Sequence, residues 1–115
     1  LMGHSLEMAQ GSGVEIEFDT KQMDLIPESL EFAEWGMLPA GMYRNRHFAE
    51  EHVDVGQVPL AAQDLLFDPQ TSGGLLISLP EKDAFKLLDD IRAIAPETAI
   101  IGRMKAKAER AIEVI

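Results

Sequence analysis

The sequence predicts an α+β fold in which helices pack on a mixed β-sheet. Residues 14–18 alternate apolar and charged side chains with a period of two, which is typical of a strand with one face in water. Residues 81–95 carry apolar side chains in a single helical stripe. Short apolar runs at 75–79 and 98–102 have the length and composition of buried strands. The 115 residues suffice for one domain, because domains usually hold about 100 to 200 residues.

The first half is predicted to form a helix, a strand and a second helix, followed by a loop. Apolar side chains at every third or fourth position over 1–10 predict a helix, and the glycines after it predict a turn. The alternating strand over 14–18 comes next. Pro27 is suited to the first turn of a helix that stops at Gly36. Residues 42–58 mix bases, histidines and acids without a clean period, so we expect mostly loop there.

The second half is predicted to alternate helices with apolar strands. Pro59 opens a short helix, turn-forming residues follow, and the run at 75–79 is predicted to be a buried central strand. The helix over 81–95 is next, then a buried strand at 98–102 and a last strand at 111–115. The connection between these two strands is predicted to be a hairpin-like link with four basic side chains, Arg103, Lys105, Lys107 and Arg110.

The charge of the chain restricts its partners. Twenty acidic and ten basic residues give a net charge of −10, and residues 1–60 hold eleven of the acids but three of the bases. A field of this sign repels phosphate backbones and anionic headgroups, so we expect no nucleic-acid and no membrane partner. Cysteine is absent, which excludes disulfides and thiolate chemistry, and no apolar run reaches the roughly 18 residues of a spanning helix. We expect a cytoplasmic chain.

The acidic side chains of the first half are predicted to be solvated. Strand alternation puts Glu15 and Glu17 together on an exposed face, and a solvated face is a better interpretation than a cation site. Trp35 is the single tryptophan, and we expect it in the core or at its rim. Helical spacing places three further glutamates on an exposed helix face, namely Glu28, Glu31 and Glu34.

The only imidazole groups are those of His4, His47 and His52. A metal site would require them to converge, and the sequence contains no His-Glu-x-x-His pattern. We therefore favour structural interpretations. His4 is expected to cap a helix or lie at the edge of the core, and the other two histidines are expected to be solvated.

A glycine loop is the segment with the clearest functional potential. Thr71, Ser72, Gly73 and Gly74 can present backbone N–H groups and two hydroxyls in a small concavity, a geometry that holds an anion. The loop differs from a Walker loop, because no Gly-Lys-Ser/Thr follows and a strand is predicted next. Alternatively, the paired glycines only allow a positive φ or a close backbone approach in a tight turn. The residues alone leave both hypotheses open.

The string Asp-Pro-Gln-Thr-Ser-Gly-Gly-Leu-Leu at 68–76 resembles the hallmark of the selenophosphate synthetase (selenide, water dikinase) family. Three further segments are similar to family segments, so the resemblance covers the whole chain. They are Gly3-His4 with Glu7-Met8-Ala9, then Pro39-Ala40-Gly41 leading to Arg44-Asn45, and the ending with Ile101-Gly102 and residues 112–115.

The resemblance implies the fold of the C-terminal domain of the aminoimidazole ribonucleotide synthetase superfamily. Residues 1–115 would be that single domain, and the N-terminal ATP-binding domain would be absent from this chain. The uncapped helix start at Leu1 agrees with a cut end. Enzymes of the family make selenophosphate from selenide, ATP and water and release AMP and phosphate. Their nucleophile and their ligands for magnesium and ATP lie in the N-terminal half, so we expect no catalytic residue, metal ligand or activity in this chain alone.

The resemblance also implies partners and a site. The chain would face its own N-terminal domain, with ATP and selenide bound in a full-length enzyme that is expected to be a homodimer. Two alternatives are an autonomous acidic protein-interaction module and the C-terminal domain of a sister ATP-dependent enzyme, such as thiamine monophosphate kinase or a hydrogenase-maturation protein. The residues carried over as facing the interdomain cleft are Thr71, Ser72, Gly73, Gly74, His4 and Asn45.

Overall fold

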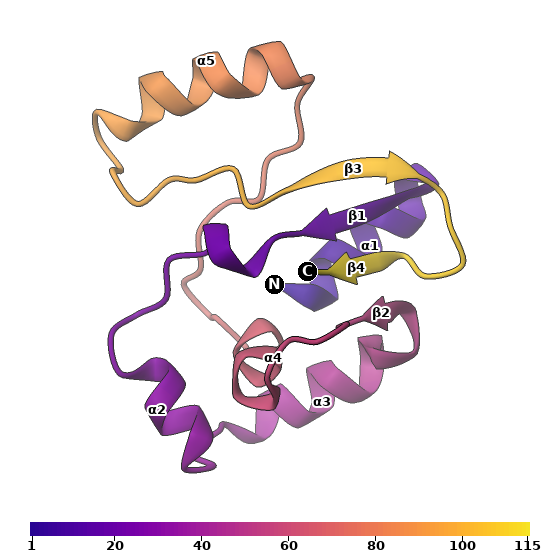
Figure 1. Ribbon diagram of the computed structural model, residues 1–115, viewed down its shortest axis with the longest axis vertical. Helices are drawn as coiled ribbons and strands as arrows, with labels where there is room; N and C mark the ends of the chain where they lie inside the picture. The colour runs from indigo at the N-terminus through magenta and orange to yellow at the C-terminus, as the bar shows by residue number, and fades with distance from the viewer.

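The computed structural model describes all residues 1–115 and contains a four-stranded mixed sheet with the order β2-β4-β1-β3 (Figure 1). β1 (Val14–Phe18) pairs antiparallel with β3 (Gly102–Ala106) and parallel with β4 (Ile112–Val114). β2 (Val53–Asp54) extends the sheet by pairing parallel with β4. The predicted α+β fold with helices on a mixed sheet is confirmed.

Five α-helices accompany the sheet, and none of them has both the length and the apolar content needed to cross a membrane. α1 packs against β1, β4 and α3, while α5 stands apart beyond β3 (Figure 1). The predicted helices after Pro27 and Pro59 are present as α2 and α4. The helices are α1 (Met2–Ser12), α2 (Ser29–Glu34), α3 (Ala40–Ala49), α4 (Leu60–Leu66) and α5 (Glu81–Arg92).

The core lies between one face of the sheet and the helices α1, α3 and α4. Alternate residues of β1 and β4 point into it, as the period-two pattern of the sequence predicts. Burial of these apolar side chains is the main force that holds the layers together. The buried cluster comprises Met2, Leu6, Ala9, Ile16, Phe18, Met42, Ala49, Val53, Leu66, Phe67, Ile112 and Val114.

α1 confirms the first predicted helix and continues two residues beyond residue 10. Gly13 ends it in a left-handed conformation with φ of 66°, and its N–H bonds the carbonyl oxygens of Ala9 and Gln10. Glycine adopts this conformation without a steric penalty, which explains why the helix ends there.

The prediction of a loop over residues 42–58 is wrong, because α3, a 3₁₀ turn (Glu50–His52) and β2 occupy most of it. The inward positions of α3 follow helical spacing, but two of them are polar. Met42 and Ala49 are fully buried, whereas Asn45 and Arg46 turn inward to bond residues next to them in space. A pattern search that counts only apolar residues misses such a stripe.

The predicted central strand at 75–79 is also wrong. The segment makes no backbone hydrogen bond, and Leu75 is 91% exposed. An apolar composition can predict a buried strand, but a strand also needs a neighbour with which to pair. In the structure both neighbours of β1 are other strands, β4 and β3, and the segment 75–79 pairs with none of the four strands.

The strand predicted at 98–102 instead begins at Gly102 and runs to Ala106. Two of the four basic residues predicted for the hairpin-like link therefore lie in this strand. Arg103 and Lys105 lie opposite Glu17 and Glu15 in the register of β1 and β3. A Cβ on Gly102 would clash with the carbonyl oxygen of Glu17. This close approach, rather than a turn, requires glycine at the start of β3.

α5 confirms the most strongly patterned helix, although it ends at Arg92 instead of residue 95. None of its residues is fully buried. Its apolar stripe lines a groove instead of entering the core, because the segment 75–79 does not close the space between α5 and β3.

Candidate functional site

The glycine loop lies on the surface between α4 and the segment 75–79. Residues 71–74 are all exposed. Two short backbone bonds shape the chain before them: Gln70 N–H donates to the carbonyl oxygen of Asp68 at 3.0 Å, and Gly73 N–H donates to that of Gln70 at 3.3 Å. The hydroxyls of Thr71 and Ser72 form no hydrogen bond within the chain. Both hydroxyls are therefore available to a group outside this chain.

The two glycines of the loop differ in whether the surrounding chain leaves room for a side chain. Neither adopts a positive φ. A Cβ on Gly73 would lie 3.2 Å from Cβ of Gln70, so local packing restricts this position. A Cβ on Gly74 would meet nothing within 4 Å. The turn hypothesis therefore accounts for Gly73 by close approach, and it does not account for Gly74.

Asn45 joins α3 to the start of the loop. Its Nδ2 donates to the carbonyl oxygen of Phe67 at 2.9 Å, one residue before Asp68. Gly41, in the first turn of α3, lies so close to the ring of Pro69 that a Cβ would be 2.7 Å from its Cγ. The structure thus places the Asn45 side chain at the base of the loop. No pattern in the sequence indicated this hydrogen bond.

His4 is not connected to the loop by any hydrogen bond or ion pair. Its Nδ1 lies 3.0 Å from Oε2 of Glu7, one turn along α1, and its side chain is almost fully exposed. The prediction that His4 caps a helix or lies at the core edge is wrong, because its side chain leaves α1 toward solvent. His47 and His52 are exposed as predicted. The structure contains no group of three or more metal-ligating side chains.

An ion pair that sequence reasoning missed anchors the helices behind the loop. Arg46 Nη2 of α3 donates to Oδ1 of Asp64 at 2.5 Å, and Nη1 donates to Oε1 of Gln63 at 3.3 Å. The guanidinium also lies 4.8 Å from the ring centroid of Phe67. Arg46 therefore fixes α4 against α3 just before the chain enters the loop. No local pattern could reveal a pair separated by eighteen residues.

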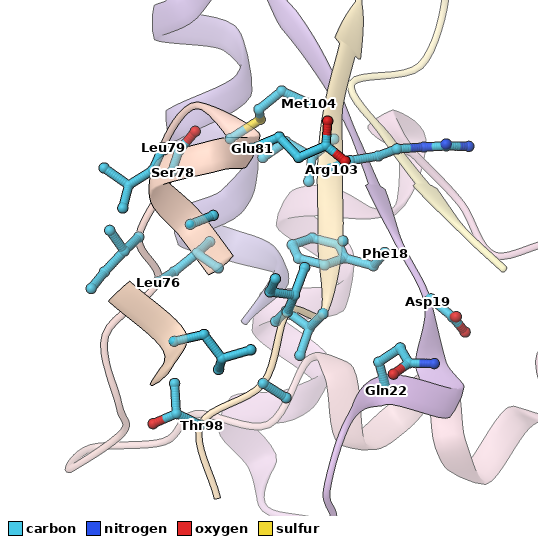
Figure 2. Close-up of a pocket in the computed structure, with 18 of the residues that line it drawn as sticks. Phe18, Asp19, Gln22, Leu76, Ser78, Leu79, Glu81, Thr98, Arg103 and Met104 are labelled. Atoms are coloured by element: carbon cyan, nitrogen blue, oxygen red, sulfur yellow. The ribbon is translucent and has the colours of Figure 1, made fainter. Parts of the chain in front are cut away.

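An apolar groove beside the glycine loop does not contain the predicted site residues. It is a groove of 840 Å³ between α5, the segment 75–79, residues 98–104 and β1 (Figure 2). Most of its lining is apolar, and its few polar groups include Asp19, Glu81 and Arg103. Without converging polar groups, the groove offers no chemistry for a phosphate or a metal. The glycine loop ends where one wall of the groove begins, at Leu75.

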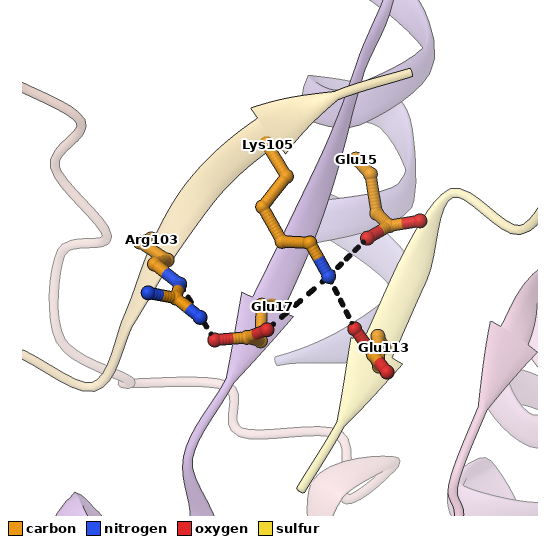
Figure 3. A network of polar contacts seen from close by, with 5 residues as sticks. All are labelled: Glu15, Glu17, Arg103, Lys105 and Glu113. Atoms are coloured by element: carbon orange, nitrogen blue, oxygen red, sulfur yellow. Dashed lines mark hydrogen bonds and ion pairs between the residues drawn. The ribbon is translucent and has the colours of Figure 1, made fainter. Parts of the chain in front are cut away.

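The face of the sheet opposite the core carries a network of five charged side chains (Figure 3). Nζ of Lys105 lies 2.5 Å from Glu113, 2.9 Å from Glu15 and 3.2 Å from Glu17. The hydrogen bond to Glu113 and those to the other two carboxylates raise the pKa of Lys105. Nε of Arg103 lies 2.7 Å from Glu17, and this hydrogen bond lowers the pKa of Glu17 and raises that of Arg103.

This network corrects the prediction of a solvated face for the first two glutamates. Glu15 is 6% exposed and Glu17 is largely covered, because basic side chains of β3 lie directly across the ladder from them. The helix-face glutamates are exposed as predicted. Every carboxylate in the network pairs with a cation of the same chain, so the charges of this network stabilise the sheet and leave no carboxylate for a ligand.

Comparison with known proteins assigns the chain to a family. The family model described as "AIR synthase related protein, C-terminal domain" matches residues 1–115. "Selenide, water dikinase" of Clostridioides difficile is 46% identical over 117 residues, which cover 100% of this chain and 34% of that protein. The protein of the same name from Treponema denticola is 44% identical over 119 residues, covering 99% of the chain and 34% of that protein.

"Selenide, water dikinase 2" of Peptoclostridium acidaminophilum is 44% identical over 115 residues, covering 99% of the chain and 33% of that protein. The chain thus spans about a third of the length of the curated relatives it matches. Because the family model matches every residue, the chain belongs to the family of AIR synthase related protein C-terminal domains.

Proposed function

We propose that this chain is the C-terminal domain of a selenide, water dikinase, an enzyme that makes selenophosphate from selenide, ATP and water and releases AMP and phosphate. The observation that carries the proposal is the similarity of the whole chain to one third of each relative of that name. The string at 68–76 supports it, because it resembles the hallmark of the family and includes Gly74, for which local packing gives no reason.

In this proposal the glycine loop closes a site built mainly by another domain. The free hydroxyls of Thr71 and Ser72 would donate to an anionic group, and Gly74 would allow that group to approach the backbone. Asn45 would hold the base of the loop through the carbonyl of Phe67. His4 would contribute from α1, where its imidazole is almost fully exposed beside Glu7.

Magnesium and ATP would be bound by residues outside this chain, since no cluster of carboxylates or histidines here is suited to a metal. The role of the domain is therefore to complete and close the site, not to carry the nucleophile. We further propose a cytoplasmic, homodimeric full-length enzyme whose N-terminal ATP-binding domain is the first partner of this chain.

The test is product analysis with the full-length protein under anaerobic conditions. With selenide, ATP and Mg²⁺, we expect selenophosphate, seen by ³¹P NMR, and AMP in equal amounts, and neither product when selenide is omitted. Residues 1–115 alone should form neither product. Release of ADP instead of AMP, or turnover that needs thiamine monophosphate and ignores selenide, would place the chain in a sister enzyme.

A further inference from the structure

α2 lies at the periphery of the molecule (Figure 1), and it and the residues just after it carry exposed apolar side chains interspersed with glutamates. Phe32, Trp35 and Met37 are 45%, 61% and 64% exposed. This result overturns the expectation that the single tryptophan lies in the core or at its rim. The reason is that α2 buries only Ala33 against the rest of the chain.

The three apolar residues follow one another closely at the end of α2. The rings of Phe32 and Trp35 meet edge to face, with centroids 5.8 Å apart. The N–H of Met37 donates to the carbonyl oxygen of Phe32 at 2.9 Å, because Gly36 turns the chain back with φ of 74°. The backbone of Met37 is thereby held next to that of Phe32. We call these three residues, with Glu28, Glu31 and Glu34, the acidic aromatic patch.

The charge around the patch is of one sign and is unpaired. The three glutamates are exposed, and none of them belongs to any of the seven ion pairs of the chain. No basic residue occurs between Lys21 and Arg44. This situation contrasts with the sheet network, where each carboxylate has a cation partner. The patch therefore has carboxylates free to accept cations from outside.

We infer that the acidic aromatic patch is a docking surface for a basic amphipathic protein segment, in which lysine or arginine side chains flank apolar anchors. Exposed apolar clusters with charged rims mark interaction sites on soluble domains. Tryptophan is a frequent centre of binding energy, and its ring also attracts a cation that stacks on it. The glutamates steer a basic partner to the patch and repel nucleic acid and anionic lipid.

The test measures the fluorescence anisotropy of labelled peptides mixed with the full-length protein. The probe is a 15-residue peptide with leucine and lysine at helical spacing; one control peptide carries glutamate for lysine and another carries serine for leucine. We expect saturable binding of the first peptide alone, weakened by added salt. Glu31→Lys and Met37→Ser should each weaken binding by about 5-fold or more.

Two matched variants separate the patch from the overall acidity and apolar surface of the chain. Glu97→Lys makes the same charge change at another exposed position, and Ile94→Ser removes an apolar side chain that is 87% exposed just after α5 ends. Both should leave binding unchanged. Equal binding of the acidic peptide, equal weakening by the matched variants, no binding at all, or binding to phosphatidylcholine vesicles in place of the peptide would overturn the inference.

Discussion

Replacement of Arg46 by methionine removes the cation that links α3 to α4 and leaves the apolar part of the side chain in place. Asp64 then keeps a carboxylate whose side chain is only 11% exposed, without a partner. Breaking a fully buried pair costs about 3–5 kcal/mol, whereas an exposed pair contributes about 0–1 kcal/mol. The arginine side chain is 21% exposed. We therefore expect a loss near 2–3 kcal/mol of unfolding free energy, of which about 0.5–1 kcal/mol reflects the contact with Phe67.

The assay is urea unfolding at 25 °C of a double-mutant cycle with Arg46→Met, Asp64→Leu and the double variant. Because the double variant leaves no unpaired buried charge, it should be more stable than the sum of the single losses predicts, by about 1–3 kcal/mol. Lys86→Met, which removes an exposed and unpaired cation of α5, is the control and should stay within about 0.5 kcal/mol of the parent. Single losses and a coupling energy all below about 0.5 kcal/mol would refute the anchoring role of this pair.

Three further changes test local features of the fold. The hydrogen bond from Arg103 is the main cause of the lowered pKa of Glu17. Above the unfolded-state pKa of Glu17, near 4.5, this interaction stabilises the folded chain, and the stabilisation is lost as the pH falls through the folded-state pKa. Arg103→Gln should therefore make the free energy of unfolding, measured by urea titration, fall less steeply between about pH 5 and 3. Glu28 is the only non-glycine residue with positive φ, 64°, so Glu28→Gly should raise stability by about 1 kcal/mol. Gly102→Ala should lower the free energy of unfolding by about 1–3 kcal/mol, because the added Cβ would clash with the carbonyl oxygen of Glu17. The Cβ added by Gly74→Ala would have no neighbouring atom within 4 Å, so this variant should keep the melting temperature of the parent.

Local sequence patterns correctly predicted those helices and strands that can be recognised without knowing which other segments they pack against. β1 alternates strictly, and its bounds agree with the prediction. α5 has one clear apolar stripe, and α4 follows a proline that is suited to a helix start. Each of these signals lies within a few residues of chain, where periodicity reports on burial directly.

The errors share a cause, which is dependence on distant residues. α3 was missed because Arg46 faces inward toward Asp64 in the next helix. Glu15 is buried because Lys105, ninety residues later, neutralises it. The run at 75–79 is apolar enough for a central strand, but β1 pairs with β3 and β4 from later in the chain, and the run itself pairs with no strand. At the candidate site, the string predicted a turn-forming glycine loop, whereas the attachment of the loop through Asn45 could be found only from the fold.

The proposed role of the glycine loop depends on two free hydroxyls, so the decisive measurement is kcat/KM for selenophosphate formation by full-length Thr71→Ala and Ser72→Ala variants, beside their melting temperatures. A hydrogen bond to a charged group contributes about 1.5–3 kcal/mol, which corresponds to roughly 10- to 150-fold in kcat/KM. Ser12→Ala, an exposed hydroxyl at the far end of α1, is the control. We predict losses in this range at unchanged melting temperature for the loop variants alone. Wild-type kinetics for both loop variants would contradict the account and leave the loop as a turn.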